Sequence, residues 1–398
     1  MNVLMLTLLY PQDQIEEARS NAKDKIQNQI NSYQYAYIAG IRQQLRSGES
    51  LSIVNCLPVG IFPLQYRKPW LSKGWHDEKS IWNLSCLNVP PWKQAMRRRA
   101  AAAALETWLK KSVENRTVLI YTLYLPYLQA VASLQAKYPD MKATVIVTDL
   151  PNDLGLPTGR KGLMKKLEYR LGKASMELCK RMDGYVLLTR PMAEALEVGQ
   201  KPYLVMEGLI QETSNTIQSV EIQNSVLYTG TLETELGIGE LLTAFAQMPE
   251  TELWICGQGG AQNAVEEAAK RHPNIRYFGL VPREQALKLQ RQAACLINPR
   301  PSSGLFTRYS FPSKTLEYMR SGKPVLCYRL EGIPEDYDPY LCYIDGRGAE
   351  GIQAAVRAMM SRTPQERAKL GEAARTYVMT HKTPAVQGKR LCDFLRSL

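Results

Sequence analysis

Short apolar runs alternate with helical patterns along the whole chain. The runs have little polar alternation, which is typical of parallel strands covered on both faces. The segments between most of them repeat apolar residues at helical spacing. This alternation predicts an α/β fold built on doubly wound parallel sheets. The expected strands of the first series are residues 3–9, 51–57, 82–87, 117–123, 143–148, 184–188 and 203–206.

A polar stretch at residues 211–219 interrupts this pattern, and a second series of strands follows it. We interpret the stretch as a linker, so the sequence predicts two Rossmann-like domains facing a cleft, with ligands at the carboxyl ends of the strands. Residues 58–80, rich in proline and aromatic residues, are expected to form a long excursion at the cleft edge. The second series of strands is residues 225–228, 252–256, 275–278, 294–298, 325–328 and 341–344.

Composition favours a globular protein with buried cores over a membrane-spanning, secreted or disulfide-rich one. A chain of 398 residues with 45% hydrophobic content can bury full cores. Its apolar runs stay well short of the about 20 residues that a membrane span requires. The N-terminus lacks the basic start and cleavage site of a signal peptide, so we expect a cytoplasmic protein. Eight cysteines include no Cys-x-x-Cys pair, and five lie in apolar runs, which favours buried thiols over disulfides or zinc.

The net charge of +12 implies an anionic partner. Between residues 160 and 181, eight basic residues oppose two acids and leucines recur at helical spacing. Such a helix can rest on an anionic membrane surface or turn its apolar stripe to its own core, and both interpretations stay open. Nucleic acid is disfavoured because no recognised binding motif accompanies the charge. Candidates for a membrane or acceptor surface are Lys161, Lys165, Lys166, Arg170 and Lys173, with Arg97 and Arg98 from a second basic cluster.

One stretch, residues 311–326, combines a loop, a short helix and a buried strand. Pro312 suits the first turn of a helix, Ser313 can cap it, and Gly322 ends it. The first amides of a helix lack intrahelical partners and its dipole is positive there, so the helix start is an anion site. Glu317 is the one acid within this stretch.

The stretch resembles the donor-site motif of glycosyltransferase family 4, retaining enzymes of GT-B architecture, in its Phe-Pro-Ser-Lys form. The resemblance continues at residues 228–230, 254–260, 277–281 and 295–299. It implies that the helix start holds the diphosphate of a nucleotide sugar and that Glu317 bonds the ribose. It also implies a C-terminal helix that crosses back to the first domain. The expected domains are 1–208 for the acceptor, a linker at 209–222, 223–382 for the nucleotide sugar, and a crossover helix at 383–398.

The mechanism that the resemblance implies is transfer with retention at the anomeric carbon. The helix amides and a cation stabilise the leaving diphosphate, and a diphosphate oxygen takes the acceptor's proton, so neither a metal nor another cofactor is expected. Asp149, which follows the strand at 143–148, would orient the acceptor hydroxyl or cap its own loop. The candidate donor-binding residues are Gly230, Gly257, Gly279, Asn298, Arg300, Arg308, Tyr309, Ser313, Lys314, Thr315 and Glu317, with Lys314 also a catalytic candidate.

The chain departs from the family pattern at two places. Tyr309 stands where the family has the first of two acids, the one that reads the transferred sugar. Thr231 and Leu236 stand where the family commonly has Arg and Lys for the diphosphate. We expect Lys314, with Arg308 or Arg300, to supply the missing charge.

The resemblance and the basic helix together favour a UDP-sugar donor and a saccharide acceptor linked to a lipid diphosphate, as in bacterial surface polysaccharide assembly. The protein would then lie peripherally on the inner face of the plasma membrane. The departures keep a second class open, a catalytically weak partner or regulatory subunit of a glycosyltransferase complex. A nucleotide-sugar epimerase would need more ionisable cleft residues than the sequence offers.

Overall fold

The chain forms two compact units in the computed structural model. Unit 1 comprises Met1–Leu209 and Pro384–Leu398, and unit 2 comprises Ile210–Thr383. The structure describes residues 1–23, 28–111, 114–151, 154, 162–210 and 222–398. Lys161 and most of the expected linker at 209–222 therefore lie outside the described residues.

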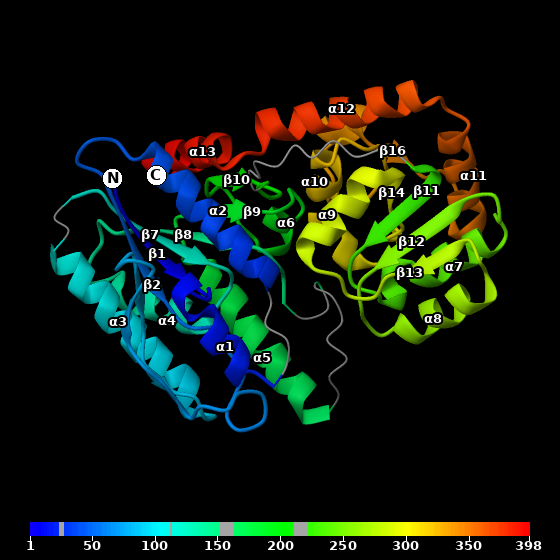
Figure 1. The fold of residues 1–398 in the computed structure, drawn as a ribbon. Coiled ribbons are helices and arrows are strands. Elements are labelled where there is room, and N and C mark those ends of the chain that lie inside the picture. The colour runs from blue at the N-terminus through cyan, green and yellow to red at the C-terminus, as the bar shows by residue number, and fades with distance from the viewer. Residues whose placement is uncertain (24–27, 112–113, 152–153, 155–161, 211–221) are drawn as a thin grey trace. The chain divides into compact units, whose positions relative to one another are not determined.

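Unit 1 is built on an eight-stranded sheet with the strand order β10-β9-β8-β7-β1-β2-β5-β4 (Figure 1). Its strands are parallel except β4, which runs antiparallel to β5 at the sheet edge. The strands are β1 (Asn2–Thr7), β2 (Ser50–Asn55), β4 (Gly74–His76), β5 (Ile81–Asn83), β7 (Arg116–Tyr121), β8 (Lys142–Val147), β9 (Gly184–Leu187) and β10 (Tyr203–Val205).

The excursion after β2 differs from the expectation in one respect. The single strand expected at 82–87 is two strands, β5 and β6 (Cys86–Leu87). The second part leaves the large sheet because it pairs antiparallel with β3 (Trp70–Leu71), inside the excursion. A small two-stranded ribbon therefore follows the carboxyl end of β2.

Helices complete unit 1 on both sides of its sheet (Figure 1). Ile38 and Ile41 of α2 share a buried cluster with Val3 and Met5 of β1, so this helix covers one face of the central strand. The helices are η1 (Gln12–Gln14), α1 (Ile15–Asn21), α2 (Asn28–Gln44), α3 (Trp92–Lys111), α4 (Leu125–Leu134), α5 (Gly162–Cys179) and α6 (Met192–Ala195).

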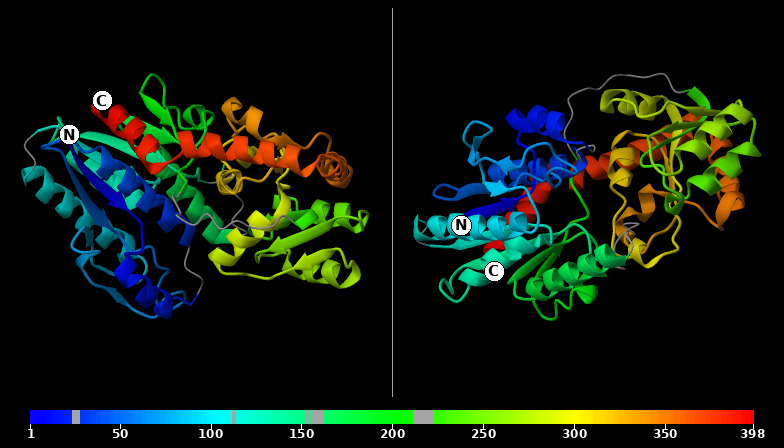
Figure 2. Two further views of the ribbon diagram at one scale, coloured as in Figure 1. Left: turned by 45° about the horizontal axis from the view of Figure 1, so that its top comes forward. Right: turned by 90° about the horizontal axis from the view of Figure 1, so that it is seen from below.

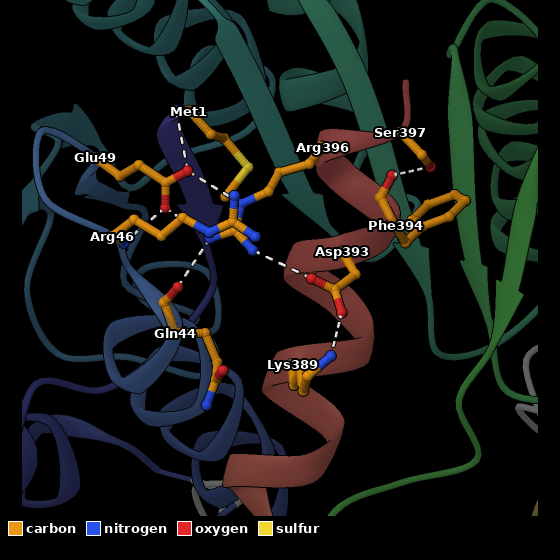
Figure 3. Close-up of polar contacts among 9 residues, drawn as sticks. All are labelled: Met1, Gln44, Arg46, Glu49, Lys389, Asp393, Phe394, Arg396 and Ser397. Carbon is orange, nitrogen blue, oxygen red and sulfur yellow. Dashed lines mark hydrogen bonds and ion pairs between the residues drawn. The ribbon is translucent and has the colours of Figure 1, made fainter.

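The C-terminal helix α13 (Pro384–Arg396) belongs to unit 1 and packs along α2. Leu391 and Leu395 join the cluster that contains Ile41. At the end of α13, Arg396 donates hydrogen bonds to the carboxylate of Glu49, which also pairs with the N-terminal ammonium group at 3.3 Å (Figure 3). The expected return of the C-terminal helix to the first domain is confirmed.

Unit 2 contains a six-stranded parallel sheet with the order β13-β12-β11-β14-β15-β16. This is the strand order of a doubly wound dinucleotide-binding fold. Helices α9 and α10 lie on one face, and α7, α8 and α11 on the other (Figures 1 and 2). The strands are β11 (Ile222–Thr229), β12 (Glu252–Cys256), β13 (Ile275–Tyr277), β14 (Ala293–Asn298), β15 (Val325–Cys327) and β16 (Cys342–Tyr343).

The helices of unit 2 follow its strands in alternation, so both sheets have the doubly wound α/β form that the sequence predicts. They are η3 (Thr234–Leu236), α7 (Ile238–Ala246), α8 (Gln262–Arg271), α9 (Arg283–Gln292), η4 (Leu305–Thr307), α10 (Ser313–Arg320), η5 (Glu335–Tyr340), α11 (Gly348–Met360) and α12 (Pro364–His381).

The interior explains the unbroken apolar runs. All six residues of β14 are buried, as expected of a central parallel strand covered by helices on both faces. The five cysteines expected in strands, Cys56, Cys86, Cys256, Cys295 and Cys327, are buried thiols without disulfides, which confirms that prediction. Among the described helices, not one carries an apolar stretch long enough to cross a bilayer.

Candidate functional site

Two glycine turns at the carboxyl ends of β11 and β12 form the floor of the site in unit 2. The N–H of Gly230 donates to the carbonyl of Cys256 at 3.0 Å, and the N–H of Gly257 donates to that of Gly279 at 2.9 Å. Gly257 has a φ of +146°, and a Cβ there would lie 1.8 Å from the carbonyl oxygen of Gly230. Only glycine lets these two turns touch, because any side chain would force the backbones apart.

The start of α7 also approaches the end of β14 closely at a glycine. Gly237 has a φ of +81°, and a Cβ at this position would lie 2.1 Å from the carbonyl oxygen of Pro299. Asn298 and Arg300, on either side of Pro299, are therefore at the same edge of the sheet as Gly230. The carboxyl ends of β11, β12 and β14 thus converge, as in other doubly wound sheets.

Helix α10 begins at Ser313, and Pro312 takes the N-cap position with extended backbone angles. The expectation that Ser313 caps this helix is therefore wrong, because Ser313 is already its first residue. Thr315 is fully buried; its N–H donates to the carbonyl of Pro312 at 2.9 Å, and its hydroxyl is buried without a hydrogen-bond partner. Burial raises the pKa of Cys256 to about 12, and the positive charge of Lys314 opposes this rise. The hydroxyl of Tyr318, on α10, lies 3.3 Å from Thr229 Oγ1 at the end of β11, so α10 packs against this edge of the sheet.

Lys314 and Glu317 form an ion pair on α10, with 3.0 Å between Nζ and Oε1. Burial by itself would raise the pKa of Glu317. Lys314, a hydrogen bond from Gln290 and the charge of Arg283 outweigh burial, so the pKa lies below its ordinary value. Glu317 is therefore an ionised, half-buried carboxylate at neutral pH.

A network of hydrogen bonds holds Glu317 against β11. Gln290 donates from Nε2 to Glu317 Oε1 at 2.7 Å and to Thr229 Oγ1 at 3.1 Å. The hydroxyl of Tyr318 accepts from the N–H of Thr229 at 2.8 Å and donates to its carbonyl at 3.0 Å. The sequence pattern does not single out Gln290, Thr229 or Tyr318. The sequence offers only a weak indication that Gln290 is functional. Gln290 lies four residues after Ala286, so the two residues share the inner face of a short polar helix.

The two candidate arginines of unit 2 are engaged by neighbouring side chains, Arg300 within its own loop and Arg308 with the loop that follows β15. Arg300 is buried, donates from Nη2 to Ser310 Oγ at 2.5 Å and lies 4.6 Å over the ring of Phe306. Arg308 lies 2.8 Å from Glu331, and its guanidinium is 5.8 Å from the ring of Tyr309, which is itself buried. Lys314 is the candidate cation that the structure places directly against Glu317.

The candidates of unit 1 divide into exposed and buried groups. Asp149 is exposed just after β8, and its Oδ1 accepts the N–H of Leu150 at 3.0 Å, the local alternative that the sequence left open. Arg98 is exposed on α3, and the four described candidates of α5 are all exposed. These four are Lys165, Lys166, Arg170 and Lys173.

Arg97 does not belong to a membrane surface, which corrects the sequence expectation. Its side chain is 4% exposed and donates to the hydroxyl of Tyr124 at 2.9 Å. The physical reason is helical spacing, since Arg97 shares the buried face of α3 with Ala101, Leu105 and Leu109 at intervals of four residues. Within the described parts of the chain, no three His, Cys, Asp or Glu side chains converge in a way that could hold a metal.

Comparison with known proteins agrees with this geometry. Residues 210–377 match the sequence profile of the family described as Glycosyl transferases group 1. No curated protein sequence matches the chain significantly.

Solved structures extend the likeness to both units. Sucrose-phosphate synthase from Thermosynechococcus elongatus has a TM-score of 0.63 at 12% identity, over 100% of this chain and 99% of that one. The pneumococcal O-GlcNAc transferase GtfA, solved with UDP and GlcNAc, has a TM-score of 0.57 at 11% identity, over 100% and 99%. TarM has a TM-score of 0.56 at 12% identity over 84% of this chain, which spans 65% of the TarM chain. At such identities the likeness concerns the fold. Residues 210–377, within unit 2, therefore resemble the glycosyl transferases group 1 family, and the whole chain has the GT-B-like fold of these solved structures.

Proposed function

We propose that the chain is a retaining glycosyltransferase that moves a sugar from a nucleotide sugar, a UDP-sugar in the first instance, to a saccharide acceptor. The observation that carries this proposal is the ionised Glu317, held by Lys314 and by Gln290, which also bonds Thr229 at the end of β11, next to Gly230. An ionised carboxylate accepts hydrogen bonds from the two hydroxyls of a ribose. The start of α10 and Lys314 offer positive potential to a diphosphate.

In the proposed reaction, the bond between the anomeric carbon and the diphosphate oxygen breaks, and a bond to the acceptor oxygen forms on the same face of the sugar. Lys314 and the first amides of α10 stabilise the negative charge that develops on the leaving diphosphate. A diphosphate oxygen takes the proton that the acceptor hydroxyl loses. Asp149 is a candidate for orienting that hydroxyl and does not itself accept the proton in this scheme.

A screen of UDP-, GDP- and TDP-sugars tests the proposal. We expect one class of donor to raise the melting temperature of the purified chain and to release its nucleotide when acceptor is added. Glu317→Gln should abolish the shift in melting temperature, because it removes the acceptor for the ribose hydroxyls. Glu284→Gln, at an exposed position of α9, is the matched control. The proposal fails if none of the donors binds, or if Glu317→Gln binds them as well as the wild type.

A second candidate function is a catalytically weak subunit of a glycosyltransferase complex. It is favoured by Thr231, Leu236 and Tyr309, which stand where the family pattern has charged residues. This candidate predicts that the chain binds a nucleotide sugar without turnover. Turnover by the purified chain alone would exclude it.

We further propose that the acceptor is linked to a lipid diphosphate and that α5 rests on an anionic membrane surface. Leu167 and Leu171 of this helix are 49% and 45% exposed, and exposed Lys165, Lys166 and Arg170 lie among them. An apolar side chain next to a basic one is the arrangement that binds the interface of an anionic bilayer. The exposure of both leucines leaves the first part of this stripe accessible to a membrane, whereas Met182, at its far end, packs in the core of unit 1.

Flotation with vesicles that contain phosphatidylglycerol tests the membrane proposal. We expect the chain to float with these vesicles at low salt and less at high salt, and Leu167→Gln/Leu171→Gln to weaken the association. Lys110→Gln/Lys111→Gln, on exposed positions at the end of α3, is a control that removes two basic charges elsewhere. Absence of flotation at every salt concentration would refute the membrane role of α5.

A further inference from the structure

Two cationic side chains are buried together at the start of α3. Lys93 and Arg97 are 5% and 4% exposed and lie one helical turn apart. Lys93 Nζ donates to the carbonyls of Val59 and Gly60, the latter at 3.2 Å. Arg97 donates to the carbonyl of Leu57 and to the hydroxyl of Tyr124. All of these partners are electrically neutral.

When Lys93 is protonated, the pair carries two positive charges that no carboxylate balances. Across the described ranges of the chain, neither Lys93 nor Arg97 forms an ion pair with an Asp or Glu, and Nε of Arg97 is buried without a hydrogen-bond partner. Burial, together with the charge of Arg97, lowers the pKa of Lys93 to about 7. Buried like charges without a counter-charge are costly, and they persist where a ligand or a special structure requires them.

The pair lies where a ligand site is expected in a doubly wound sheet. Residues 57–60 directly follow β2, and the hydroxyl of Tyr10, just beyond β1, donates to the carbonyl of Pro58 at 2.8 Å. Tyr124 follows β7 and precedes α4. The cations therefore lie at the carboxyl ends of three adjacent central strands, at the same end of unit 1 as the start of α5 (Figure 1).

A short loop separates the pair from solvent. The loop that supplies the three carbonyls continues into residues 61–65, where Leu64 is 71% exposed. Carbonyl oxygens are weaker partners for a cation than the oxygens of a phosphate, which carry formal charge. An anion that enters beneath this loop could therefore replace the carbonyls and neutralise both side chains.

We propose that Lys93, Arg97 and Tyr124 form a phosphate-binding site in unit 1, which takes the phosphate or diphosphate group of the acceptor when residues 57–60 release the two cations. Arg97 and Lys93 donate to the phosphate oxygens. The hydroxyl of Tyr124, which accepts from Arg97 and donates to Gln94 Oε1 at 2.8 Å in the structure, turns its proton to the phosphate and completes the set of donors. The inference rests on the proposed function for the source of the phosphate, whereas the anion chemistry follows from the residues themselves.

Titration calorimetry with inorganic diphosphate tests the site. The full chain carries Lys314→Ala in every arm, so the result does not depend on whether unit 2 binds a nucleotide sugar. We expect one diphosphate to bind and Arg97→Gln to weaken it at least tenfold, since a charge-assisted hydrogen bond contributes on the order of 1.5–3 kcal/mol. Lys93→Arg should retain binding and Lys93→Met should lose it. Lys110→Met, exposed on the same helix, is the control.

Melting temperatures measured without diphosphate distinguish an anion-binding site from two side chains that only stabilise the loop at residues 57–60. If the two cations serve to bind an anion, Lys93→Met removes an unbalanced buried charge. The melting temperature of this variant is then equal to that of the parent protein or higher. Absence of diphosphate binding to the parent protein would overturn the inference, and so would binding that is unchanged in Arg97→Gln. A short-chain prenyl diphosphate and a hexose phosphate then identify the source, because the probe that binds more tightly than inorganic diphosphate carries the natural group.

Discussion

The guanidinium of Arg396, in the last helix, lies 2.7 Å from the carboxylate of Glu49, just before β2, through Nη2 and Oε2. A second hydrogen bond joins Nε to Oε1 at 3.0 Å. The hydrogen bonds from Arg396 are the largest cause that holds the pKa of Glu49 at about 2, well below its ordinary value of 4.5. This pair fastens the end of α13 to the rest of unit 1 (Figure 3).

The Arg396 and Glu49 pair predicts how the stability of unit 1 depends on pH. A carboxylate with a lowered pKa stabilises the fold above its unfolded pKa, and this contribution is lost as the pH falls from about 4.5 toward 2. Glu49→Gln should lower the free energy of unfolding at pH 7 by about 1 to 2 kcal/mol, after allowance for screening by solvent.

Chemical unfolding at several pH values checks this expectation. The difference between Glu49→Gln and the wild type should shrink below pH 4.5, where the wild-type carboxylate begins to protonate. Glu267→Gln removes an exposed pair with Arg271 and should change stability by less than about 0.5 kcal/mol. A difference that stays constant between pH 7 and pH 3 would show that the charge of Glu49 is not the cause.

Lys314→Ala should weaken nucleotide-sugar binding severely, because it removes the cation next to Glu317 at the start of α10. Loss of one charge-assisted contact to a diphosphate predicts roughly a 10- to 100-fold rise in Kd. Calorimetry with the donor found in the screen measures it. Lys288→Ala, at an exposed position of α9, should bind normally. Unchanged affinity in Lys314→Ala would remove Lys314 from the site.

Gly257→Ala should disrupt the donor site because it displaces the backbone of the two glycine turns. Its Cβ would lie 1.8 Å from the carbonyl oxygen of Gly230, and its φ of +146° is unfavourable for alanine. Both turns must shift, at a cost of about 1–3 kcal/mol or more, and donor binding should be lost. Gly239→Ala is the matched control, because its Cβ would meet nothing within 4 Å. Equal donor affinity in the two variants would contradict the role of the glycine turns.

The strands and the glycine turns could be predicted because their signals are local. The buried strand β12 was expected at the residues where it occurs, since an apolar run and the glycine that ends it are adjacent in the chain. Glu317 could be singled out for the same reason, as the one acid in a helix with clear start and stop signals. The expected α10 differs only at its first residue, where Pro312 leaves no side-chain cap.

One miss comes from a local spacing within α3, and the others depend on contacts between distant segments. Arg97 was placed on the surface because it lies in a run of basic residues, although its spacing from Leu105 and Leu109 puts it on the buried face of α3. The contact of Gln290 with Glu317 spans 27 residues and depends on how α9 packs beside α10. The pairing of β6 with β3 is likewise set by the fold of the excursion after β2.

Gln290→Leu should make donor binding sensitive to acid. Gln290 donates to Glu317 Oε1 at 2.7 Å, and this hydrogen bond helps to keep the pKa of Glu317 below its ordinary value. Without it, burial of the carboxylate is less well offset and the pKa rises, so Glu317 protonates at a higher pH than in the wild type. We expect the affinity for the donor to fall about tenfold. The acid limb of its pH profile should move toward neutral pH.

Donor titrations between pH 4 and pH 8 distinguish this positioning role from a general loss of structure. Gln285→Leu, exposed on the same helix, should leave both the affinity and the pH profile unchanged. A fall in affinity that is the same at every pH would mean that Gln290 only packs against Glu317. The shifted acid limb, by contrast, can arise only if the hydrogen bond from Gln290 sets the charge of the carboxylate that receives the ribose.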